Sequence, residues 1–159
     1  LSFLLCLFLL SSCENKREKE IGLIVEEIKK SFAAKDYTYL NNLASFERMM
    51  EKAYVRLRIP YRQMKASVRD IERRTSLSDH LTYNDNSIRL RVVSHDDKKI
   101  TIAIQNDSLL ANYADLIIKP IKDKLRIADF YLYQQGYSFS DEMQFFAVKI
   151  LFLNENRRV

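Results

Sequence analysis

The spacing of apolar residues changes near residue 84, and this change determines which fold class the chain can adopt. Before residue 84, apolar side chains recur every three or four residues, which is the period of one helix face. After it, apolar and polar side chains alternate, as they do in a strand with one buried face. Helices followed by a run of strands predict an α+β domain, in which the helices cover one face of a sheet.

Three helices are expected in the first half of the chain. The first covers residues 18–34, and one of its faces carries the apolar residues Ile21, Ile24, Val25, Ile28 and Phe32. Thr38 is expected to cap the second, over residues 40–57, whose pattern allows a break near Ser45. The third helix is expected over residues 61–75.

Four strands are expected in the second half, over residues 88–92, 100–105, 113–119 and 125–133. The connections are short, so the strands should be antiparallel neighbours. Gly136 follows the last strand, and Ser138 or Ser140 should cap a C-terminal helix whose first turn carries Asp141 and Glu142. The expected fold is therefore N-terminal helices packed on a four-stranded curved antiparallel sheet, followed by one helix.

One segment of this pattern resembles a known family. Residues Leu125 to Tyr131 (L-R-I-A-D-F-Y), followed by Gly136 and Ser140, are similar to a strand, glycine turn and serine-started helix of the cystatin-like superfamily, which includes the nuclear transport factor 2-like domains. Bacterial lipoproteins of uncharacterised function share this layout. The resemblance implies a single cystatin-like α+β domain over residues 21–159, which several such proteins extend with further helices.

The N-terminal run carries a second resemblance. Residues 1–12 are uncharged and largely apolar, and the run is too short to span a bilayer, which takes about 20 apolar residues. Leu10-Ser11-Ser12-Cys13 resembles the bacterial lipobox, which implies cleavage of a signal peptide over residues 1–12 and lipid attachment at Cys13. No initiator Met or basic segment precedes the run, so the natural sequence begins upstream or Leu1 stands for a non-standard start. The alternative is a buried N-terminal helix or strand of a cytosolic fold.

Residues 13–20 are then expected to be a lipidated tether between the membrane and the domain. Cys6 would leave with the signal peptide, and an acylated Cys13 cannot form a disulfide, so the domain must rely on its apolar core. The sequence pI is about 9.2, but the basic residues are dispersed among acidic ones. That arrangement indicates a solvated surface with weak attraction to anionic lipids, and not a nucleic-acid-binding stripe.

Few residues are placed for chemistry. His80 and His95 stand in polar clusters, without metal-ligand spacing, and are expected in surface turns. No serine lies in a nucleophile-elbow motif, and Gly22 and Gly136 are too few for a phosphate-binding loop. No catalytic residue, metal or cofactor is therefore expected.

Asp129 is the most interesting polar residue. Strand alternation places it on one face with Leu125, Ile127, Tyr131 and Tyr133. If that face lines a concave pocket, burial would raise the carboxyl pKa and favour acid or base chemistry. The resemblance points the same way, because ketosteroid isomerase, in the wider fold family, uses carboxylates and a tyrosine in such a cavity. The alternative is structural: Asp129 hydrogen-bonds a tyrosine or a helix N-terminus.

These observations favour a lipid-anchored binding or assembly module of the bacterial cell envelope, held to a membrane through Cys13 and contacting an envelope protein. The nine tyrosines offer contact area at low entropic cost. The alternative function is a small-molecule-binding or isomerase-like enzymatic domain with a pocket around Asp129, Tyr131 and Tyr133.

Overall fold

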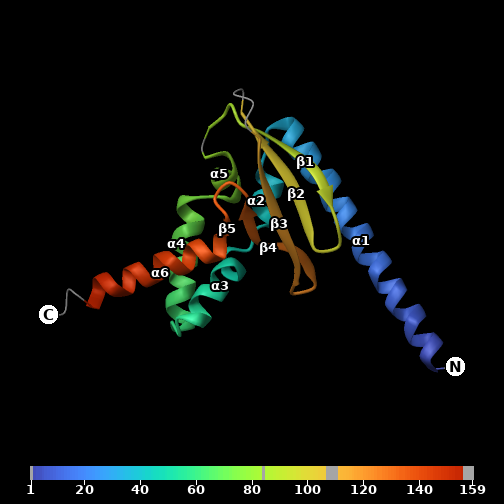
Figure 1. Ribbon diagram of the computed structural model, residues 1–159, viewed down its shortest axis with the longest axis horizontal. Helices are drawn as coiled ribbons and strands as arrows, with labels where there is room; N and C mark the ends of the chain where they lie inside the picture. Colours follow the sequence, from blue (N-terminus) through green and yellow to red (C-terminus); the bar gives the residue numbers. More distant parts are fainter. Residues whose placement is uncertain (1, 84, 107–110, 156–159) are drawn as a thin grey trace.

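The computed structural model describes residues 2–83, 85–106 and 111–155, and it confirms the α+β class (Figure 1). The helices are α1 (Ser2–Ala34), α2 (Thr38–Leu43), α3 (Phe46–Arg56), α4 (Tyr61–Arg74), α5 (Leu77–Thr82) and α6 (Phe139–Glu155). The strands are β1 (Arg89–His95), β2 (Lys99–Gln105), β3 (Ala111–Ile121), β4 (Lys124–Leu132) and β5 (Tyr137–Ser138). They form one antiparallel sheet in the order β1-β2-β3-β4-β5, so every strand pairs with its neighbour in sequence.

The core lies between the helices and one face of this sheet. The predicted apolar face of α1 is buried there, with Ile21 and Ile28 fully inaccessible to solvent. Ile100, Ile102 and Leu116 of the sheet belong to the same buried cluster and are also fully inaccessible to solvent. In Figure 1, α1 runs along the β1 side of the sheet, whereas α3, α4 and α6 gather near β4. Helix α1 therefore packs beside β1.

Helix α1 is longer than expected. It continues from Ser2 without interruption, so residues 13–20, which we expected to form a tether, belong to the helix. The composition explains this, because the Glu, Lys and Arg residues that dominate 14–20 are strong helix formers. The Arg17 guanidinium donates to the Ile118 carbonyl at 3.4 Å, so α1 contacts the sheet from that residue onward.

A Schellman motif ends α1. Lys35 adopts a left-handed backbone (φ 52°) and donates its N–H to the Phe32 carbonyl at 3.2 Å, while Asp36 N–H donates to the Ser31 carbonyl at 3.0 Å. The chain then turns, and the Tyr37 ring meets the Phe32 ring edge-on at a centroid distance of 6.1 Å. This turn fixes Lys35 and Tyr37 beside strand β1, where they become part of the site described below.

Two details of the helix pattern differ from expectation. The break near Ser45 is confirmed, because α2 ends at Leu43 and α3 begins at Phe46. Thr38 is not an N-cap, however: it is the first residue of α2, and its N–H donates to the Asp36 carboxylate at 3.0 Å. An aspartate two residues earlier satisfies this donor, so a threonine cap is not needed.

Helix α5 and strand β5 were not predicted. Ser76 and Asp79 form a capping box at the start of α5, with Ser76 N–H donating to the Asp79 carboxylate at 2.7 Å and Asp79 N–H donating to the Ser76 hydroxyl at 3.3 Å. The Ser-x-x-Asp spacing was visible in the sequence as a variant of the capping-box pattern. Strand β5 has two residues, which are too few to show any periodicity.

Candidate binding groove

Asp129 does not lie on the face that strand alternation predicted. Asp129 pairs with Ile117, whereas Ile127 pairs with Ile118, so Ala128 is an extra residue in β4. This bulge shifts the alternation by one position. Leu125 and Ile127 face the core before it, Phe130 and Leu132 face the core after it, and Asp129 shares the opposite face with Tyr131 and Tyr133. The predicted grouping of Asp129 with Leu125 and Ile127 is wrong, and the grouping with the two tyrosines is confirmed.

The Asp129 carboxylate accepts hydrogen bonds at the beginning of α6. Its Oδ1 accepts from the backbone N–H of Ser140 at 3.1 Å and of Phe130 at 2.9 Å, and its Oδ2 accepts from the Ser140 hydroxyl at 2.6 Å. Ser140 is almost fully buried. The carboxylate thus holds a helix N-terminus, which is the structural alternative considered for it above.

Ser138, and not Ser140, is the N-cap of α6. The Ser138 hydroxyl accepts from Asp141 N–H at 3.3 Å and donates to the Asp141 carboxylate at 2.7 Å, and Lys52 of α3 pairs with that carboxylate at 2.9 Å. These bonds hold the Asp141 pKa below its ordinary value, the Lys52 bond contributing most. Lys52 of α3 therefore neutralises the charge of Asp141 in the first turn of α6.

His80 was expected in a surface turn, and that prediction is wrong. It lies in α5, and its ring packs against Phe139 (centroids 4.9 Å apart), Phe130 (5.9 Å) and Phe46 (6.4 Å). Burial lowers the His80 pKa, although the charge of Asp79 opposes the shift, and the Nε2 atom is buried without a hydrogen-bond partner among the described residues. The burial of His80 depends on the contact between α5 and α6, which the local sequence pattern does not reveal. His95, by contrast, is exposed at the end of β1.

A polar network lies on the sheet face that carries the tyrosines. Asp115 is 6% exposed and accepts from Lys99 Nζ at 2.7 Å, Thr101 Oγ1 at 2.7 Å and Tyr133 Oη at 3.1 Å. Burial acts to raise the Asp115 pKa, but these hydrogen bonds outweigh it and the pKa lies below its ordinary value. Tyr131 stacks edge-on against Tyr133 at 5.3 Å. The network joins β2, β3 and β4, and sequence reasoning missed Asp115 because Thr101 meets it only through the β2–β3 register.

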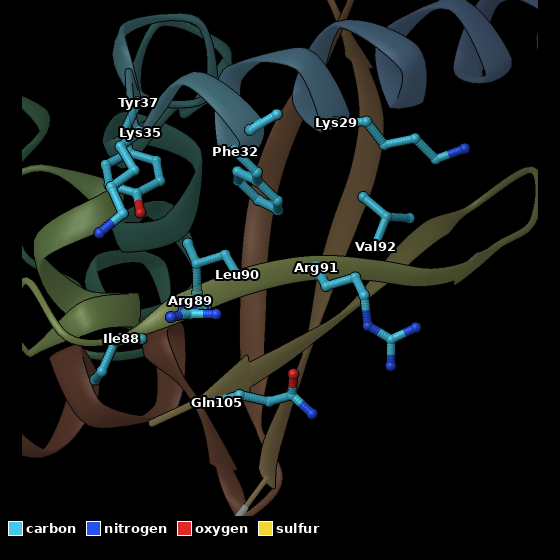
Figure 2. Close-up of a pocket in the computed structure, with 11 residues that line it drawn as sticks. Lys29, Phe32, Lys35, Tyr37, Ile88, Arg89, Leu90, Arg91, Val92 and Gln105 are labelled. Atoms are coloured by element: carbon cyan, nitrogen blue, oxygen red, sulfur yellow. The ribbon is translucent and has the colours of Figure 1, made fainter. Parts of the chain in front are cut away.

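The hollow that could hold a partner lies elsewhere, between the end of α1 and strand β1 (Figure 2). It is an open groove of about 490 Å³. Figure 2 shows Leu90 and Val92 pointing toward Phe32 of α1, while Arg91 points away from the helix. The residues that line the groove are Lys29, Phe32, Ala33, Lys35, Tyr37, Ile88, Arg89, Leu90, Arg91, Val92 and Gln105.

The charge of this groove has one sign. Its ionisable residues other than Tyr37 are Lys29, Lys35, Arg89 and Arg91, and no acidic residue lines it. Lys29 pairs with Glu26 at 2.7 Å on the exposed face of α1, and Lys35 donates to the Asn86 carbonyl at 3.4 Å. Within the described chain, neither Arg89 nor Arg91 has a carboxylate partner. An anionic group would therefore find unpaired guanidinium groups there.

A second groove, between α3 and the β3–β4 end of the sheet, is larger, at about 740 Å³, but an acidic residue, Glu51, lines it and two of its four basic residues pair with carboxylates. Arg48 pairs with Glu51 inside α3, and Lys52 pairs with Asp141 of α6. This contrast favours the groove between α1 and β1 as the binding site. Asp129, Tyr131 and Tyr133 do not line either groove.

No family model matches this chain, and the curated proteins include no significant match. In the part of the chain that the structure describes, no cluster of three or more His, Cys, Asp or Glu side chains could hold a metal ion. In the same part, no helix has the length and apolar character needed to cross a membrane.

Proposed function

We propose that this chain is a lipid-anchored, non-catalytic binding module of the bacterial cell envelope, and that an acidic protein partner occupies the groove between α1 and β1. The observation that carries this proposal is the charge of the groove: four cationic side chains and no acid surround an apolar floor of Phe32, Leu90 and Val92. A partner with carboxylates beside apolar groups complements both features.

The lipid anchor in this proposal is supported by the lipobox-like residues 10–13, and the cystatin-like relationship by the order of helices, antiparallel sheet and final helix. A membrane tether would raise the local concentration of the module near envelope partners. The isomerase-like alternative receives no support, because the Asp129 carboxylate accepts two hydrogen bonds from Ser140 at the start of α6 and one from the Phe130 N–H.

A small anionic amphiphile is the second candidate occupant. The groove volume, about 490 Å³, lies within the range of about 300–1,000 Å³ that is usual for small-molecule sites. The groove is open, and the consecutive residues 88–92 line it. An extended protein segment suits this shape better than a small molecule does.

The test uses an anionic polymer of no particular conformation. The full chain in a neutral detergent should bind fluorescein-labelled poly-L-glutamate, measured by fluorescence anisotropy, and added salt should weaken the binding because exposed charges are screened. The double variant Lys35→Gln/Arg89→Gln should bind less tightly. Arg69→Gln/Arg73→Gln, on the exposed face of α4, removes the same charge outside the groove and should bind as wild type. Equal weakening by both variants would overturn the proposal.

A further inference from the structure

The groove follows the open edge of a strand. Residues 88–92 all line it, although consecutive strand residues point to opposite faces of a sheet. Only the edge of a strand presents both sets of residues to one hollow. In the strand order β1-β2-β3-β4-β5, strand β1 pairs with β2 on one side and is an edge strand on the other.

The register shows which backbone groups face the groove. Ile118 N–H donates to the Lys98 carbonyl at 2.7 Å, which sets the hydrogen-bonding phase of β2. The backbone groups of even-numbered β2 residues therefore bond to β3, and those of odd-numbered β2 residues bond to β1. Ala103 and Gln105 pair with Arg91 and Arg89. Arg89 and Arg91 therefore use their backbone groups on β2, and the N–H and C=O groups of Leu90 and Val92 point to the open edge.

Those edge groups are available. Among the residues that the structure describes, no hydrogen bond reaches the backbone of Leu90 or Val92 from the open side. A bulge at Val93 interrupts the ladder immediately afterwards, which limits the usable edge to a short stretch ending at Val92. Unpaired strand edges accept extended peptides, whose backbone supplies affinity and whose alternate side chains supply specificity.

We propose, building on the function proposed above, that the partner contributes an extended segment of alternating acidic and apolar residues, which pairs with β1 as a sixth strand. Its apolar side chains lie on the inner face, against Phe32 and Val92. Its acidic side chains lie on the outer face, beside Arg89 and Arg91. The alternation of the partner matches that of β1 because cross-strand neighbours share a face.

The probe is a fluorescein-labelled heptapeptide of alternating Glu and Val, and its affinity for the full chain in neutral detergent is measured by anisotropy. We expect it to bind at least tenfold more tightly than a peptide of the same composition with its Glu residues grouped in one block. The corresponding Lys-Val peptide should not bind. Equal affinity of the alternating and block peptides would overturn the strand geometry.

Backbone methylation supplies a sharper test. One version of the Glu-Val peptide carries backbone N-methyl groups on its Glu residues, and a second version carries them on its Val residues. An added strand turns one set of amides toward β1 and the other away, so one version should lose binding and the other should keep most of it. Loss in both or in neither would contradict pairing with β1.

The protein side is tested with matched variants. Arg89→Gln/Arg91→Gln should weaken Glu-Val peptide binding by about 3- to 10-fold through two lost cross-strand charge pairs, and Arg69→Gln/Arg73→Gln should leave it unchanged. Hydrogen exchange should slow at Leu90 and Val92 when the peptide is bound, with little change at Arg89 and Arg91. Unchanged exchange at Leu90 and Val92 would overturn the inference.

Different results would disprove the acidic partner and the added strand. Tight binding of poly-L-glutamate to the groove without preference for the alternating peptide would leave the acidic partner in place and overturn the added strand. Binding of inorganic phosphate or phosphatidylglycerol vesicles, with neither acidic peptide nor polymer bound, would overturn both in favour of a lipid or phosphate ligand.

Discussion

The Ser140 hydroxyl donates to the Asp129 carboxylate at 2.6 Å, which ties the first turn of α6 to the middle of β4. The same carboxylate also accepts the Ser140 backbone N–H. Asp129 therefore stabilises the fold by accepting hydrogen bonds from the buried Ser140.

Removing this carboxylate should destabilise the domain. Asp129→Ala removes the acceptor of the Ser140 backbone N–H and one acceptor of the buried Ser140 hydroxyl, and it should lower the free energy of unfolding by about 1–3 kcal/mol. Asp129→Asn keeps one acceptor oxygen and should cost less. Urea unfolding followed by circular dichroism measures both, with Glu72→Gln on the exposed face of α4 as the control. A loss of function in the cell by Asp129→Asn with unchanged stability would instead restore the isomerase-like hypothesis.

Acid should destabilise the domain through His80. Its folded-state pKa is lowered by burial, so the unfolded chain takes up the proton first as the pH falls. The free energy of unfolding should therefore be highest above the unfolded pKa of 6.5 and should decrease as the pH falls below it. Chemical denaturation at several pH values measures this dependence. His80→Gln should flatten it, and His95→Gln, at an exposed position, should not.

Asp115 should be the costliest polar residue to replace on the outer sheet face. It is nearly buried and accepts three hydrogen bonds from neighbouring strands. Asp115→Ala should lower the unfolding free energy by about 1–3 kcal/mol, because the Thr101 hydroxyl and its neighbours lose their acceptor. Asp70→Ala, which breaks an exposed pair with Arg74 in α4, should have a much smaller effect on the same denaturation curve.

The core face of β2 should reject charge. Ile102 is fully buried, so Ile102→Asp places an unpaired carboxylate in the core and should prevent folding. Gln105→Asp, at an exposed position on the same strand, should be tolerated. Thr101 is a poor control, because an aspartate there would meet the Asp115 carboxylate. Similar circular dichroism spectra for the two variants would contradict the observed alternation.

Membrane attachment should depend on Cys13. If the lipobox is used, Cys13→Ala should prevent lipidation, and the protein should leave the detergent phase in a phase-partitioning assay or accumulate as an uncleaved precursor. Stable attachment takes more than one acyl chain, because a single myristoyl chain binds membranes with only about 10⁴ M⁻¹. Cys6→Ala is the matched control and should partition as wild type.

The pattern of apolar residues by itself determined the class of fold, the positions of α1, α3 and α4, and the four longer strands. These features follow from local periodicity, since a helix or strand with one buried face repeats its apolar residues at a fixed interval. The tertiary structure alone decided which face Asp129 occupies, because the bulge at Ala128 is an irregularity of pairing with β3. It also decided the burial of His80, the assembly of the Asp115 network and the groove along β1, because each brings together residues far apart in the chain, and periodicity carries no information about such contacts.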